Sequence, residues 1–119
     1  MLAPCIGNMH GLYPSDPVPF FKLPLLDELQ ASVGYKSGKG AHLVLHGTDM
    51  LPDHLFKDCV KRGCVKVNIN SWARQPQLDV WAREIPKDTP LPDIYEDGMK
   101  AFEKACLHFF DLFESSGKA

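Results

Sequence analysis

The stretch AHLVLHGTDMLP, residues 41–52, decides the fold of this chain. Its apolar run LVL, residues 43–45, is bounded by turn residues and is typical of a buried strand. His46 ends the run, and Gly47 allows the backbone to turn. Pro52 is well placed to open a helix. We therefore predict a strand, a loop and a helix, with a histidine at the carboxyl end of the strand.

Two other segments repeat this layout. Residues 1–11 place His10 and Gly11 after an apolar run, and residues 63–71 end a strand pattern in Asn68 and Ser71. Ligands bind at the carboxyl ends of parallel strands. A lone histidine there is more often a strand cap that bonds a carbonyl group. The repetition instead favours a site in which histidine binds a metal and asparagine, serine and backbone N–H groups hold an anion.

Hydrophobic periodicity predicts alternating strands and helices along the rest of the chain. We expect strands at 2–7, 42–46 and 65–69, a loop at 11–21, a glycine-rich turn at 34–40, and helices at 23–33, 52–62, from Ser71 onward, and 94–114. Helices between consecutive strands imply parallel pairing and right-handed crossovers. A parallel sheet of three strands is incomplete, because parallel strands are normally buried on both faces.

Composition bounds the classes of function. The 119 residues suffice for one small domain, and the formal net charge of −2 gives no field that favours nucleic acid or an anionic membrane. No apolar run approaches the roughly 18 residues needed to cross a bilayer. Cys5, Cys59, Cys64 and Cys106 form no C-x-x-C pair, so we expect buried free thiols and a cytoplasmic protein.

Four motifs follow one another in an order that is specific to one family. They are NMHG at 8–11, HG at 46–47 followed by LP at 51–52, VKVNINS at 65–71 and SGKA at 116–119. Together they resemble the class II, metal-dependent fructose-bisphosphate aldolases and the related tagatose-bisphosphate aldolases. The resemblance covers the C-terminal part of the family's domain. It implies an α/β fold, a partial (β/α)8 TIM barrel made of the last three β/α units and the C-terminal helices, as one incomplete domain over 1–119.

The resemblance also implies a chemistry. The family cleaves fructose 1,6-bisphosphate to dihydroxyacetone phosphate and glyceraldehyde 3-phosphate with the help of Zn2+. It implies that His10 and His46 are zinc ligands. The residues that it places around the dihydroxyacetone phosphate moiety are Gly11, Gly47, Thr48, Asp49, Asn68, Ile69, Asn70 and Ser71.

The loop after Gly47 departs from the family. A small residue, serine and glycine are usual there, whereas this chain has Thr48, Asp49 and Met50. Asp49 places a carboxylate where a phosphate is expected, and two like charges at 4 Å repel by about 4 kcal/mol at intermediate dielectric. Either the ligand differs, or Asp49 points away and Thr48 donates. Met50 also removes the backbone freedom of a glycine.

A second departure concerns the acid/base. The family uses an Asp-His pair on an early barrel strand, and that strand belongs to the part that this sequence lacks. Asp53-His54 follows Pro52 at a predicted helix start, where aspartate favours the helix dipole. We therefore assign no catalytic residue and expect the chain alone to be inactive. A non-catalytic remnant or interaction protein, and an aldolase with a different sugar-phosphate donor, remain alternatives.

The expected partners follow from the same resemblance and from the predicted sheet. We expect a sugar-phosphate substrate, and we expect neither nucleic acid nor a membrane as a partner. The intact family forms homo-oligomers. In this chain, the open edges of a small parallel sheet would favour association.

Overall fold

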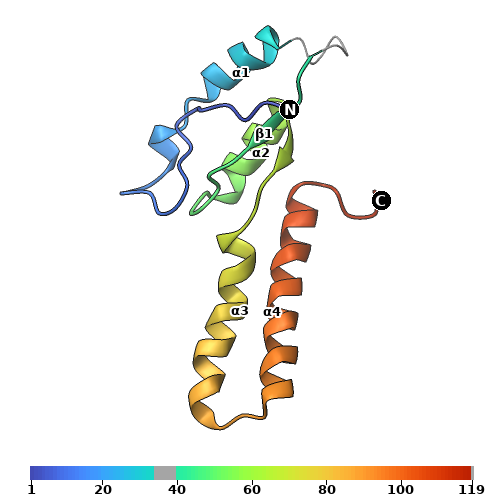
Figure 1. Ribbon diagram of the computed structural model, residues 1–119. Coiled ribbons are helices and arrows are strands. Elements are labelled where there is room, and N and C mark those ends of the chain that lie inside the picture. Colours follow the sequence, from blue (N-terminus) through green and yellow to red (C-terminus); the bar gives the residue numbers. More distant parts are fainter. Residues whose placement is uncertain (34–39, 119) are drawn as a thin grey trace. The chain divides into compact units, whose positions relative to one another are not determined.

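The computed structural model describes residues 1–33 and 40–118. The chain divides into two compact units, Met1–Ile69 and Asn70–Ala119. Figure 1 shows the elements of each unit. The first contains η1 (Val18–Phe20), α1 (Leu23–Ser32), β1 (Leu43–Leu45), α2 (Asp53–Lys61) and β2 (Cys64–Val67). The second contains α3 (Ser71–Glu84), η3 (Ile85–Lys87) and α4 (Leu91–Leu112).

The sheet of the first unit pairs β1 with β2 in parallel. Leu43 pairs with Cys64 and Leu45 with Val67, with a register irregularity after Leu43. Helix α2 connects the two strands, as a parallel crossover requires. All three residues of β1 are buried. The α/β fold and the parallel pairing that the sequence predicts are confirmed.

The predicted strand at 2–7 is wrong beyond its first position. Leu2 makes a single parallel bridge with Leu43. The N–H of Leu2 donates to the carbonyl of His42 at 2.7 Å, and the N–H of Val44 donates to the carbonyl of Leu2 at 2.9 Å. The next donor in this alternation would come from Pro4, which has no N–H. The described sheet therefore has two strands and one bridge, and not three strands.

The core of the first unit forms where α1 and α2 meet the buried strand. Its fully buried side chains are Ile6, Leu26, Leu43, Leu45, Leu51, Leu55, Phe56, Cys59 and Cys64. Three of them lie on one side of the amphipathic helix α2. This core fixes the end of β1, from which the candidate site begins.

The four cysteines are free thiols, but they are not all buried as we expected. Cys59 and Cys64 are buried, Cys106 is half-buried and Cys5 is exposed. Cys5 is exposed because the segment around it leaves the sheet after Leu2. Burial raises the pKa of Cys59 to about 12 and that of Cys64 to about 11.

The second unit is a pair of helices that lie side by side in Figure 1. The two helices are in close contact at Gly98 of α4, where a Cβ atom would lie 2.3 Å from Nε1 of Trp81 on α3. The Trp81 ring also packs edge-to-face against Tyr95, with centroids 5.7 Å apart. Within this unit α3 runs without interruption through Pro76.

The predicted helices agree with the structure to within a few residues. Helix α3 begins at Ser71 as expected, whereas α4 begins at Leu91 instead of 94. The earlier start is possible because a proline in the first helical turn, here Pro92, displaces no intrahelical hydrogen bond. The turn expected at 34–40 falls, except for Gly40, outside the described residues. No helix in the described ranges is long and apolar enough to span a membrane.

Candidate functional site

The two histidines predicted as metal ligands lie next to each other in the first unit. His46 directly follows β1, and His10 lies on the loop after the Leu2 bridge. Their ring centroids are 5.8 Å apart and the ring planes are inclined by 58°. His10 is exposed and His46 is half-buried. Two imidazoles from distant parts of the sequence therefore face one region at the carboxyl end of β1.

Asn8 joins the loop of His10 to the end of β1. Its side-chain oxygen accepts a hydrogen bond from the N–H of Ile6 at 2.8 Å. Its amide nitrogen donates to the carbonyl of His46 at 3.0 Å. The asparagine of the NMHG motif thus connects the backbone before His10 to the backbone of His46.

Tyr13 makes a second connection between the same loops. Its hydroxyl group accepts from the N–H of Met9 at 2.8 Å and donates to the carbonyl of Gly47 at 2.9 Å. Burial raises the pKa of the Tyr13 phenol, the hydrogen bond from Met9 opposes this, and the nearby charge of Asp49 raises the pKa further. The Tyr13 side chain is only 5% exposed. A neutral phenol therefore serves as a fixed tie between the loops.

Gly47 meets a strict steric requirement. Its φ of +62° lies in the left-handed region, and a Cβ atom there would lie 2.3 Å from the carbonyl oxygen of Met9. Glycine is needed for both reasons. Met50, three residues later, also has a φ of +62°. The family's usual glycine at that position would adopt this conformation without strain, whereas methionine does not.

Asn68 reaches the ring of His46 from the segment after β2. Its amide nitrogen lies 3.1 Å from Nδ1 and 3.2 Å from Nε2 of His46, and its backbone N–H donates to the carbonyl of Leu45 at 3.0 Å. The Lys66 ammonium group contacts the side-chain oxygen of Asn68. Asn68 therefore fixes the position of the His46 ring relative to the end of β1.

Thr48 and Asp49 both bind within the chain. Thr48 is buried, with 4% of its surface exposed. Its hydroxyl group donates to the carbonyl of Asn68 at 2.7 Å. The Asp49 carboxylate accepts the N–H of Gly11 at 3.1 Å. The N–H of Gly11, which the family resemblance assigns to the ligand, is therefore held by a carboxylate of the same chain.

The remaining predicted residues lie after β2. Ile69 is half-buried and ends the first unit, while Asn70 and Ser71 begin the second. Ser71 is the first residue of α3, as predicted. The structure thus brings together all the predicted residues of the first unit except Ile69, namely His10, Gly11, His46, Gly47, Thr48, Asp49 and Asn68.

The donor set predicted for a metal consists of the two imidazoles of His10 and His46. Within residues 1–33 and 40–118, no group of three or more His, Cys, Asp and Glu side chains could hold a metal ion. Asp53 and His54 are both exposed at the start of α2. This position agrees with the expectation that Asp53 favours the helix dipole.

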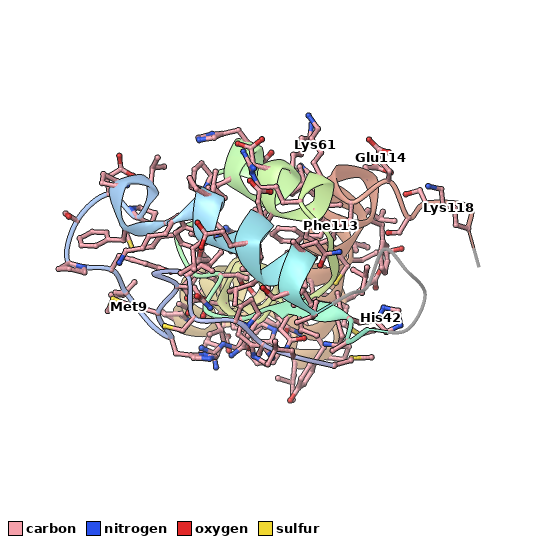
Figure 2. The ribbon with its side chains drawn as sticks, turned by 90° about the horizontal axis from the view of Figure 1, so that it is seen from above. Met9, His42, Lys61, Phe113, Glu114 and Lys118 are labelled. Carbon is pink, nitrogen blue, oxygen red and sulfur yellow. The ribbon has the colours of Figure 1, made fainter. Side chains whose placement is uncertain are left out.

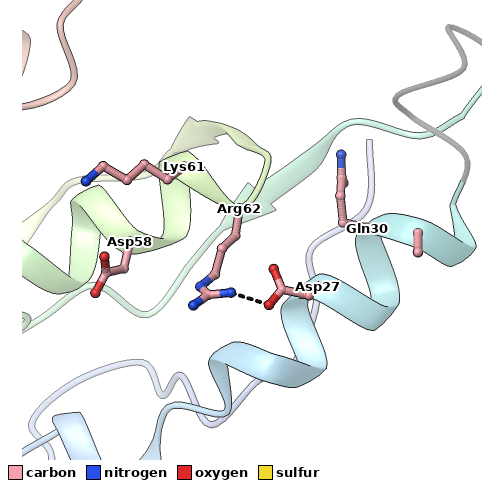
Figure 3. Close-up of a pocket in the computed structure, with 6 residues that line it drawn as sticks. Asp27, Gln30, Asp58, Lys61 and Arg62 are labelled. Atoms are coloured by element: carbon pink, nitrogen blue, oxygen red, sulfur yellow. Dashed lines mark hydrogen bonds and ion pairs between the residues drawn. The ribbon is translucent and has the colours of Figure 1, made fainter.

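A pocket of about 390 Å³ lies elsewhere in the first unit, between α1 and α2 (Figure 3). The Arg62 guanidinium group and the Asp27 carboxylate form an ion pair at its wall. Lys61 extends outward from the end of α2 in Figure 2. The lining residues are Asp27, Gln30, Ala31, Asp58, Lys61 and Arg62, and none of them belongs to the predicted site.

Residues 1–118 match the family described as fructose-bisphosphate aldolase class-II. The chain belongs to this family. The match includes both histidines and the segment around Asn68. The family identity inferred from the four motifs is therefore confirmed.

Several sequences and solved structures are similar to this aldolase-family chain. A candidate fructose-bisphosphate aldolase of Coccidioides immitis is 33% identical over 99% of the chain and 37% of its own length. The fructose-bisphosphate aldolase of Streptococcus pneumoniae is 35% identical over 99% of the chain and 42% of its own length. The crystal structure of the YdjI aldolase from Escherichia coli K12 has a TM-score of 0.83 at 28% identity, over 98% of the chain and 40% of that structure. The chain thus spans about two fifths of these relatives.

Sequence reasoning missed three residues of this candidate site in the aldolase-family chain. Tyr13 and Lys66 were not predicted, and Asn8 was noted as part of a motif without a role. The position of Asn8 beside His10 was a usable signal, because asparagine readily bonds nearby backbone groups. Tyr13 directly precedes Pro14 at the start of a proline-rich loop and carries no periodic signal.

Proposed function

We propose that this chain carries the zinc-binding and donor-binding part of an aldolase that cleaves or forms a carbon–carbon bond of a sugar-phosphate ketose. The observation that supports this most is the juxtaposition of His10 and His46, with ring centroids 5.8 Å apart, inside a segment that matches the family. Fructose 1,6-bisphosphate is the reference substrate. A different donor is the second candidate, favoured by the bond between Asp49 and the N–H of Gly11.

The residues present fit zinc in part. Two neutral imidazoles are suitable nitrogen ligands, and a catalytic zinc site usually has three protein ligands. We propose that His10 and His46 supply two and that a further ligand completes the site. Bound zinc would polarise the ketone and stabilise the negative charge that develops on it. The chain's own residues would orient the site, since Asn68 holds the ring of His46 and Asn8 holds its backbone.

We further propose that the three segments ending in His10, His46 and Asn68 are the last three β/α units of a partial (β/α)8 barrel. Their neighbouring order, with Leu2 bridged to β1 and β1 paired to β2, supports consecutive barrel strands. A cytoplasmic location agrees with four free cysteines. A homo-oligomer of the intact protein, and association of sheet edges in this chain, belong to the same proposal.

A chimera tests the function. The matched segment of the Streptococcus pneumoniae relative is replaced by this chain, and zinc-dependent condensation with glyceraldehyde 3-phosphate is measured with dihydroxyacetone phosphate or dihydroxyacetone as donor. We expect product with at least one donor, and loss of product in His10→Ala and His46→Ala. His54→Ala, on the exposed start of α2, is the matched control and should keep activity.

Zinc titration of the 119-residue chain gives a readout that does not depend on activity. Each site variant should weaken zinc binding by about tenfold or more, whereas His54→Ala should leave it unchanged. A folded chimera without product would favour the non-catalytic alternative. Equal zinc affinity in all variants would remove the metal proposal.

A further inference from the structure

The loop formed by residues 47–50, here called the Asp49 loop, is built around its own carboxylate. Its first residue is tied by Tyr13, and Thr48 is tied to the carbonyl of Asn68. These two bonds leave Asp49 facing the His10 loop, where it accepts the N–H of Gly11 at 3.1 Å. The hydrogen bond to Gly11, together with the two bonds that fix the residues before it, therefore directs the carboxylate toward the His10 loop.

The Gly11–Asp49 bond changes what this part of the site can bind. Gly11 has a φ of +88°, and its backbone N–H is a donor that an anion could use. Here one carboxylate oxygen, Oδ2, already uses it. Within the described residues the other oxygen, Oδ1, accepts no hydrogen bond. An ionised carboxylate offers acceptors only, so a ligand group at this position must bring a donor.

A phosphate monoester meets two obstacles at this position. It carries about −1.5 to −2 charges at pH 7, and it would approach a group of like charge. It would also need the N–H of Gly11, which is engaged. A hydroxyl group meets neither, because it is neutral and can donate to the free oxygen of Asp49.

Building on the proposed function, we infer that Asp49 makes this site select an aldol donor whose end at the Asp49 loop is a hydroxyl group and not a phosphate monoester. Asp49 is thus a specificity-determining residue. The strained methionine at position 50, with its φ of +62°, belongs to the same altered loop.

The first test needs neither zinc nor turnover. The 15N-labelled 119-residue chain is titrated with inorganic phosphate, and the amide resonances of Gly11 and Gly47 are followed. The wild-type chain should show no saturable shift. Asp49→Asn removes the charge with little change in shape, and should bind phosphate at least about tenfold more tightly. Asp53→Asn, which removes the same charge at the start of α2, should behave as wild type.

Phosphate binding by the wild-type chain that equals that of Asp49→Asn would overturn the inference. An equal gain in Asp53→Asn would overturn it as well, because net charge would then explain the effect. Asp49→Ser is a second variant in case Asn distorts the loop, which the resonances of Tyr13 and His46 would reveal. Two folded variants without any gain would show that Asp49 is only a brace.

The second test addresses the donor directly. In the chimera described above, the wild-type loop should favour dihydroxyacetone over dihydroxyacetone phosphate, and Asp49→Asn should shift the ratio toward the phosphate by at least about tenfold. An unchanged ratio in an active chimera would overturn the inference. A chimera without activity would count against the proposed function, while the phosphate titration would still decide the role of Asp49.

Discussion

The Tyr13 hydroxyl group donates a 2.9 Å hydrogen bond to the carbonyl oxygen of Gly47. One buried phenol therefore connects the loop that carries His10 to the loop that follows His46. The distance between the two imidazoles depends on this connection as well as on the sheet.

Tyr13→Phe should destabilise the first unit by about 1–3 kcal/mol, because the Met9 N–H and the Gly47 carbonyl each lose a buried partner. Urea unfolding followed through the amide resonances of this unit gives the free energy. Tyr95→Phe is the control, since Tyr95 is 52% exposed. Equal losses in both variants would show that the Tyr13 bonds contribute little.

Gly47→Ala and Gly11→Ala separate steric clash from backbone strain. Both glycines have positive φ, at +62° and +88°, so both variants incur strain of about 1–2 kcal/mol. A Cβ at Gly47 also lies 2.3 Å from the carbonyl oxygen of Met9, whereas a Cβ at Gly11 meets nothing within 4 Å. Gly47→Ala should therefore cost about 1–3 kcal/mol more. Unfolding free energies that agree within error would contradict the close approach.

Stability should fall at alkaline pH because of Cys59 and Cys64. Their pKa values are raised to about 12 and about 11 in the folded chain, from an ordinary value of 9.0. Above about pH 9 both thiols stay protonated in the native state, while the unfolded chain loses these protons. The contribution of the two thiols to the free energy of unfolding is therefore complete below about pH 9 and is lost as the pH rises toward 12. Chemical denaturation at stepped pH is the measurement. Cys59→Ala should flatten the decline, and Cys5→Ala, at an exposed site, should not.

The 119-residue chain alone should have no measurable aldolase activity. Its described part offers two imidazoles for a metal, and loss of a general acid/base costs about 10²–10⁴-fold. The assay is cleavage of fructose 1,6-bisphosphate with added zinc, coupled to NADH oxidation. Turnover near that of the Streptococcus pneumoniae relative, abolished by His10→Ala, would mean that a residue of this chain is the base. Asp49 and Asp53 would be examined first.

The local sequence pattern was enough to predict that the two strands pair and that His10 and His46 lie close together. The strands predicted at 42–46 and 65–69 are separated by a predicted helix, so the parallel pairing of β1 with β2 follows from their order. Carboxyl ends of parallel strands share one edge, which brings the ends of neighbouring segments together. The expected strand at 2–7 failed because the missing N–H of Pro4 matters only once its partner in the ladder is known.

The hydrogen bonds that shape the candidate site could not be predicted from the sequence. Tyr13 to Gly47 and Asp49 to Gly11 each join two loops that are far apart in the chain, and neither loop has a hydrophobic period. The sequence could show that Asp49 was unusual and left two explanations open. Both explanations depend on where the Asp49 carboxylate points, and the structure gives its position beside the N–H of Gly11.

The close contact of Trp81 with Gly98 has a spectroscopic consequence. The chain has two tryptophans, Trp72 and Trp81, and both lie in the second unit. Indole emission therefore reports the separation of α3 from α4 and is silent on the unit that carries the histidines. The buried thiols of Cys59 and Cys64 report that other unit through their reaction with a thiol reagent. Recording both signals in one denaturant series would show whether the two units unfold together or one after the other.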